Sequence, residues 1–151
     1  MTSMRRPLIL WLLIGLLLLL AVGGLYGGVS MLTDTTGVSL GVDNVLHSLP
    51  VSSYVLPGIF LSTVMGVLPL ILAFALLAGP NWKWATRMFG WSTHYWAWTG
   101  TLVLSGIIVL WLAIEGLLIG FWPITYITAI LALLIFFLCV SPSMRKYYAN
   151  G

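Results

Sequence analysis

Residues 106–123 read GIIVLWLAIEGLLIGFWP, an almost unbroken apolar run that contains one acidic residue, Glu115. A run of this length and composition is typical of a helix that crosses a bilayer, which needs roughly 20 apolar residues. A charged carboxylate at the centre of such a helix costs roughly 2.5–3.5 kcal/mol on insertion scales, so its presence calls for a structural or functional reason. The stretch therefore predicts a membrane-spanning helix that carries one candidate polar site.

The rest of the chain has a similar composition. Of its 151 residues, 61% are hydrophobic and only 6% are charged, whereas a soluble domain carries about 25% charged residues. Four long windows contain no Asp, Glu, Lys or Arg: 7–33, 44–82, 88–114 and 116–144. We therefore predict an all-α membrane protein, an antiparallel bundle of four transmembrane helices in a single domain. The predicted segments are spans at about 7–29, 56–78, 96–120 and 122–140, an external loop at 30–55 and a cytoplasmic loop at 79–95.

The charges indicate how such a bundle is oriented. All six basic residues fall on one side of the four predicted spans: Arg5, Arg6, Lys83, Arg87, Arg145 and Lys146. Short loops rich in Lys and Arg remain in the cytoplasm, so both termini are predicted to be cytoplasmic in a multi-pass protein of the cell membrane, such as a bacterial inner membrane. The basic residues lie in pairs at membrane ends and form no stripe, which argues against a nucleic-acid partner. The lipid bilayer is the partner that the composition itself predicts.

The external loop is predicted to contain a turn and a short helix. In TDTTG at 33–37, Asp34 can accept backbone N–H bonds and Gly37 permits a positive φ. In GVDNVLHSLP at 41–50, Asp43 is the expected N-cap of a helix that Pro50 ends. We expect this helix to lie on the mouth of the bundle or in the membrane interface, because the segment is too apolar for a solvated loop.

Two kinds of residue disturb the predicted spans. Pro69 removes one backbone hydrogen bond and is expected to kink the second span. Three small-xxx-small pairs lie near the outer ends of the first and third spans: Gly23/Gly27, Gly24/Gly28 and Gly116/Gly120. Such pairs allow two helix backbones to approach closely. The alternative for the four glycines of GGLYGG is a frayed, bent helix end.

The cytoplasmic connection before the third span is rich in tryptophan. Residues 81–98 hold five of the eight tryptophans, interleaved with Lys83 and Arg87. Aromatic and basic residues at a membrane face are typical of interfacial anchors.

Several short motifs are shared with a known group of proteins. They are Asp34-Thr35-Thr36-Gly37 followed by Leu40-Gly41, then Leu56-Pro57-Gly58, the Trp-rich run, Glu115 with Ile119-Gly120, and the ending Pro142-Ser143-Met144-Arg145-Lys146-Tyr147-Tyr148. On these motifs, which cover most of the chain, the protein resembles a family of small, uncharacterised bacterial membrane proteins with four helices. The first motif of that family usually reads D-P-[ST]-G, so Thr35 departs from the pattern. The resemblance implies the four-helix fold and carries no activity to this chain.

Four polar residues on the external side form the candidate site: Glu115, Asp43, His47 and Asp34. Asp43 and His47 are four residues apart, hence on one face of an α-helix. This side has no Lys or Arg, so the three carboxylates must be capped, solvated, protonated or bound to a cation. One hypothesis is an external pocket in which Glu115 holds a proton or cation below Asp43 and His47. The other is local: two aspartates that act as caps, an exposed histidine, and a Glu115 that hydrogen-bonds a neighbouring helix.

No cofactor or metal ion is predicted. Hard cations require six or more oxygen ligands and zinc sites are tightly clustered, which these residues do not suggest. His47 and His94 lie on opposite sides of the membrane, roughly 30 Å apart, so they cannot bind one haem iron. Cys139 is the single cysteine and is expected to be a small buried hydrophobic residue.

Three classes of function remain after this reading. The first is a non-enzymatic protein, an accessory, scaffold or structural subunit, which associates with itself or with a membrane-protein partner through glycine-rich helix faces. The second is a binding or transport module for a proton, a cation or a lipid-like molecule, built on Glu115 and the external loop. The third is a membrane enzyme, which ranks last because no catalytic residues converge.

Overall fold

The computed structural model describes residues 6–149, so Arg5 lies outside the described part of the chain. This part is helical and contains no strand, and four of its rods are long and apolar enough to cross a membrane. They are α1 (Leu8–Thr33), the continuous rod of α2 (Val55–Phe60), η3 (Leu61–Val67) and α3 (Leu68–Ala78), then α5 (Trp96–Ile119) and α6 (Pro123–Val140). The predicted all-α fold with four membrane helices is confirmed.

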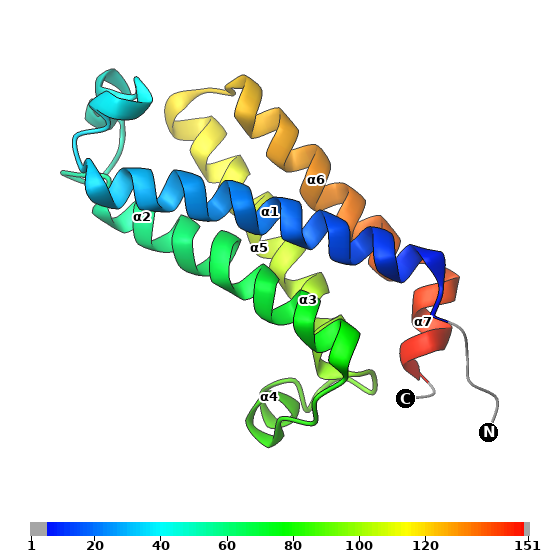
Figure 1. Ribbon diagram of the computed structural model, residues 1–151. Coiled ribbons are helices and arrows are strands. Elements are labelled where there is room, and N and C mark those ends of the chain that lie inside the picture. Colours follow the sequence, from blue (N-terminus) through cyan, green and yellow to red (C-terminus); the bar gives the residue numbers. More distant parts are fainter. Residues whose placement is uncertain (1–5, 150–151) are drawn as a thin grey trace.

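The four rods form two pairs that cross each other (Figure 1). α1 lies along α2, η3 and α3, and α5 lies beside α6. Buried aliphatic side chains from all four rods fill the space between the pairs, among them Leu13, Leu72, Ile108 and Ile135. Lipid tails are as apolar as these side chains, so in a bilayer the packing is stabilised mainly by van der Waals contact.

α1 is one turn longer than predicted, because the glycine stretch at its outer end remains helical. A Cβ at Gly24 would overlap with the backbone carbonyl of Met65, and a Cβ at Gly28 would overlap with Ser62, both in η3. The two backbones approach this closely only because these positions are glycines. The close-approach alternative therefore holds for Gly24/Gly28, and the frayed helix end does not form.

The second rod changes from α to π geometry next to Pro69, whereas the kink expected there stays a prediction. Pro69 has no N–H, so it cannot donate to the carbonyl of Met65 four residues earlier. Immediately before it the helix widens to π geometry over Leu61–Val67, and the N–H of Leu68 donates to the carbonyl of Thr63, five residues earlier. The α-helix then resumes with Pro69 in its first turn, where the missing N–H costs nothing.

The external segment contains two short 3₁₀ helices, η1 (Val38–Leu40) and η2 (Asp43–Ser48). The predicted short helix is present and ends before Pro50, but it is a 3₁₀ helix. Asp43 is its first residue and makes no capping hydrogen bond, so the predicted N-cap role of Asp43 is wrong. Tyr54 fastens the segment, since its hydroxyl donates to the carbonyl of Val42 at 2.6 Å and its N–H donates to the carbonyl of Thr35 at 3.0 Å.

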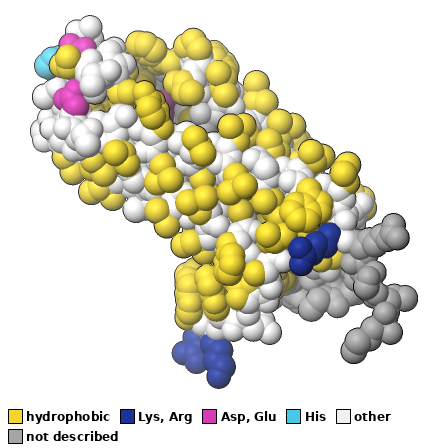
Figure 2. Space-filling view, viewed as in Figure 1, with side chains coloured by type: hydrophobic (Ala, Val, Ile, Leu, Met, Phe, Trp, Pro, Cys, Tyr) yellow, Lys and Arg dark blue, Asp and Glu magenta, His cyan; other side chains and the backbone are white. Residues whose placement is uncertain are grey.

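Charge separates the two ends of the bundle. In the described part of the chain, the Lys and Arg side chains lie at one end, the basic end, and the Asp and Glu side chains lie at the other, the acidic end (Figure 2). The three acidic residues are Asp34, Asp43 and Glu115. The N-terminal start of α1 and the C-terminal helix both lie at the basic end (Figure 1).

Two short helices at the basic end were not predicted from the sequence, which indicated only a cytoplasmic loop at residues 79–95 there. They are α4 (Lys83–Met88) and α7 (Pro142–Ala149). Each is anchored by a fully buried residue, Ala85 in α4 and Met144 in α7. A helix of this length is marginal alone, so tertiary packing stabilises both.

A network of aromatic hydrogen bonds joins α7 to the end of α3. The carbonyl of Leu76 would normally accept from the residue four positions later, but that residue is Pro80, which has no N–H. The hydroxyl of Tyr148 in α7 donates to this carbonyl instead, at 2.8 Å. Tyr95 and Trp96 likewise donate to the carbonyl of Pro80, each at 3.0 Å. Burial raises the pKa of Tyr148, which keeps its hydroxyl a donor.

Candidate functional site

Glu115 is placed by the turn that joins α5 to α6. Gly120 has a φ of +82°, a conformation that glycine adopts readily, and it reverses the chain five residues after Glu115. Phe121 then folds back over Gly116, where a Cβ would overlap with its ring. This brings Thr125 of α6 beside the half-buried Glu115, and its hydroxyl donates to Oε1 at 3.2 Å. The carboxylate therefore makes the bond to a neighbouring helix that one of the two hypotheses expects.

Thr125 was missed by the sequence analysis, although a signal existed. Glu115 and Thr125 each lie five residues from Gly120, so an antiparallel hairpin with a tight turn at Gly120 places them opposite each other. Thr125 is only 3% exposed. It also lines an apolar groove of about 290 Å³ between α5 and α6, together with Leu112, Phe121 and Tyr126.

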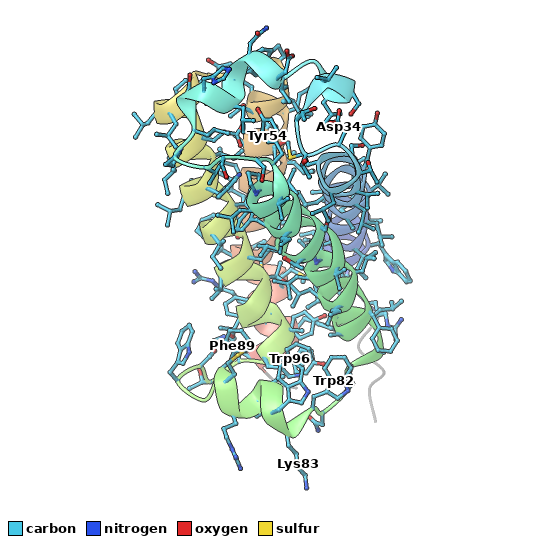
Figure 3. The ribbon with its side chains drawn as sticks, turned by 90° about the vertical axis from the view of Figure 1, so that its left-hand side faces the viewer. Asp34, Tyr54, Trp82, Lys83, Phe89 and Trp96 are labelled. Atoms are coloured by element: carbon cyan, nitrogen blue, oxygen red, sulfur yellow. The ribbon has the colours of Figure 1, made fainter. Side chains whose placement is uncertain are left out.

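Asp34 acts as a local cap at the acidic end (Figure 3). Its carboxylate accepts from the N–H of Thr36 at 3.1 Å and from the N–H of Ser39 at 2.7 Å, and it also accepts from the hydroxyl of Thr36. These bonds favour the ionised form, so they lower the pKa of Asp34 well below its ordinary value. Gly37 has the predicted positive φ, +80°. The predicted turn at residues 33–37 is thus confirmed, with Asp34 as its organising residue.

Asp43 and His47 do not share a face. Both are exposed on η2. A 3₁₀ helix has three residues per turn, so side chains four positions apart point about 120° away from each other. The prediction that they lie on one face assumed the α-helical repeat, and it is wrong for that reason.

The predicted polar residues accordingly fall into separate local arrangements. In residues 6–149, no three His, Cys, Asp or Glu side chains lie close enough together to bind one metal ion. His94 lies at the basic end and stacks on Trp98, with ring centroids 4.5 Å apart.

The six predicted association glycines have three different environments. Gly24 and Gly28 are buried against η3, and Gly116 is covered by Phe121. Gly27 lies at the edge of the interface between α1 and η3. A Cβ added there would lie 3.1 Å from a methyl carbon of Leu61. Gly23 and Gly120 are exposed, and no atom would lie within 4 Å of an added Cβ.

One further open glycine of α1 was not singled out from the sequence. Gly15 of α1 is exposed, and nothing would contact a Cβ there. It lies eight residues before Gly23, a spacing that places both glycines on the same side of an α-helix. This spacing was the signal that could have identified it.

Comparison with known proteins finds no matching family model, no similar curated protein and no similar solved structure.

Proposed function

We propose that this chain is a non-enzymatic subunit of a membrane assembly, which associates with itself or with another membrane protein through one face of α1. This outward face consists of Leu8, Leu12, Gly15, Leu19, Val22, Gly23, Tyr26 and Val29. The observation that carries the proposal is the pair of open glycines on it, Gly15 and Gly23.

A glycine inside a helix is costly unless it serves packing. Glycine destabilises a helix interior by about 1 kcal/mol relative to alanine. Gly24 and Gly28 offset this cost within the chain, because they allow η3 to pack closely against α1. Gly15 and Gly23 have no close neighbour within the chain. Gly106 of α5 is open in the same way, but among the described helices only α1 carries two open glycines on one face, which supports a helix from outside as their neighbour.

The spacing of the other residues on the outward face supports the same proposal. Apart from Gly23, its successive members, Gly15 included, alternate at intervals of four and three along α1, the repeat by which helices pack as coiled coils. Leu19 is 60% exposed and Tyr26 is 70% exposed, so these side chains are available to a partner.

The proposal is tested by native mass spectrometry of the protein gently extracted from its own membrane. We expect a defined homo-oligomer or a complex with one partner, and we expect Gly23→Ile to dissociate it. Gly106→Ile is the matched control, because Gly106 on α5 is equally open to an added side chain. A monomer in the unmodified protein would overturn the proposal, and so would an assembly that tolerates Gly23→Ile.

A binding or transport role for a proton, a cation or a lipid-like molecule is the second candidate. It is favoured by the Glu115–Thr125 pair, because ionisable residues within spans often mark such pathways. Under this alternative, Glu115→Gln abolishes uptake or ligand binding by reconstituted protein while the assembly persists. Under the first proposal, Glu115→Gln leaves the assembly unchanged, because glutamine still accepts the hydroxyl of Thr125.

The orientation and location of the protein are also proposals. The excess of Lys and Arg in its short loops supports a cytoplasmic location for the basic end, and we propose the inner membrane of a bacterial cell as the location of the protein. A cysteine introduced as Lys146→Cys should then react with a membrane-impermeant reagent only after cells are permeabilised. Labelling in intact cells would show that the protein has the opposite orientation.

A further inference from the structure

Helix α4 exposes two adjacent rows of side chains. Lys83 and Arg87 are four residues apart and form a basic row. Trp84 and Met88, also four residues apart, form an apolar row beside it, and Trp91 follows three residues after the helix ends. The opposite side of the helix is turned toward the bundle, where Ala85 is fully buried.

The apolar row is unusually exposed for a segment outside the four spans. Trp84 is 62% exposed, Met88 is 59% exposed and Trp91 is 73% exposed. Large exposed apolar side chains gathered on one segment outside the spans are typical of a site that contacts a membrane or another molecule.

Contacts within the chain fix the position of this surface. The ring of Trp84 stacks on Trp82 with centroids 6.0 Å apart, and Trp82 stacks on Trp96 at 5.4 Å. Trp96 is 5% exposed and donates its Nε1–H to the carbonyl of Pro80 at 3.0 Å. Trp84 is therefore held in place by a stack that continues into the buried start of α5.

The basic row points away from the bundle and has no acidic counterpart nearby. α4 projects from the basic end, and Lys83 extends outward from it (Figures 1 and 3). The acidic residues of the described chain, Asp34, Asp43 and Glu115, lie at the opposite end. The surface thus combines exposed cations with exposed tryptophans at the level where the membrane helices end, a combination that is complementary to anionic lipid.

We propose that α4 is an interfacial helix that binds anionic phospholipids, with Lys83 and Arg87 on the phosphate-bearing head groups and Trp84, Met88 and Trp91 inserted at the boundary of the acyl chains. This site is separate from the outward face of α1. Failure of one proposal therefore leaves the other standing.

The charge requirement is tested by adding phosphatidylglycerol or phosphatidylcholine to the full-length protein in detergent micelles and measuring the thermal midpoint. We expect phosphatidylglycerol to raise the midpoint more than phosphatidylcholine does. Lys83→Gln/Arg87→Gln should require roughly 30-fold more phosphatidylglycerol for the same shift, since each basic side chain strengthens binding several-fold. The matched control is Arg145→Gln/Lys146→Gln, which loses the same charge from α7 and should keep the response. Equal responses of the two double variants, or no preference for phosphatidylglycerol, would overturn the proposal.

The insertion of the apolar row is tested by fluorescence in vesicles of phosphatidylglycerol and phosphatidylcholine. A bimane label is attached to Trp84→Cys or, as the control, to Lys83→Cys; the native Cys139 is fully buried and stays unlabelled. Nitroxide-bearing phosphatidylcholine should quench the label at position 84 at least twofold more than the label at position 83. Equal or weaker quenching at position 84 would overturn the proposal and would point to a protein that covers this row.

Discussion

Adjacent glycines of α1 have opposite environments, and this difference can be measured residue by residue. Gly24 contacts the Met65 carbonyl, whereas Gly23 is open. We expect Gly24→Ala to destabilise the protein by roughly 1–3 kcal/mol, because the added methyl group must displace backbone. Gly23→Ala should leave the free energy of unfolding in micelles unchanged or slightly raised. Equal effects at the two positions would contradict the packing of α1 on η3.

Asp34 makes the external turn sensitive to acid. Its folded pKa lies below its ordinary value, so the stabilisation of the turn is complete above about pH 4 and is lost as the pH falls toward the lowered pKa. We expect Asp34→Ala to increase proteolysis of residues 34–54 at neutral pH. Asp34→Asn keeps one acceptor oxygen and replaces the other with an NH2 donor, so it should lose part of the protection and remove the acid dependence. Proteolysis of the unmodified protein that does not change between pH 6 and pH 3 would contradict this role.

At the scale of elements, α7 is expected to clamp the basic end. The Tyr148 hydroxyl satisfies the Leu76 carbonyl, which Pro80 leaves without a donor. Tyr148→Phe should destabilise the protein by about 1–3 kcal/mol, because it leaves a buried carbonyl unpaired. The matched control is Tyr147→Phe, which removes a hydroxyl from a neighbouring, half-buried ring. Thermal unfolding measures both, and an equal loss in the two variants would exclude a specific clamp.

The elements also show which parts of the fold could be predicted from the sequence pattern. The spans were predictable because length and charge-free composition define them without knowledge of packing. α4 and α7 were not, because each is short and is stabilised by the buried residues Ala85 and Met144. The 3₁₀ form of η2 was missed for a related reason, since its composition fits either helix type. The difference in helix type matters for the candidate site, because in a 3₁₀ helix the side chains of Asp43 and His47 point in different directions.

The same limit applies to the candidate site. Glu115 was identified because a carboxylate inside a span is conspicuous in any sequence. Its partner Thr125 depends on the geometry of the turn at Gly120, which the sequence alone does not reveal. Likewise, the sequence offered two glycine ridges on α1, and only the tertiary structure shows that Gly24 and Gly28 are used within the chain while Gly23 is not.

At the scale of the whole molecule, the four-helix protein has three distinct surfaces: its acidic end, its basic end and the outward face of α1. The acidic end is closed by the external segment that Asp34 and Tyr54 hold. The basic end carries α4 and α7. Between the ends, the outward face of α1 is the surface that we assign to a protein neighbour, and the remaining apolar surface faces lipid.

The most direct test of this assignment is photo-crosslinking in the native membrane, before any extraction. A photoreactive amino acid replaces Leu19 on the outward face of α1 or, as the control, Phe137 on α6. The two positions are equally exposed, at 60% and 61%. We expect position 19 to give one discrete adduct of protein mass, either with a second copy or with a partner, and position 137 to give lipid adducts alone. Protein adducts from neither position, or from position 137 only, would contradict the assembly proposed here.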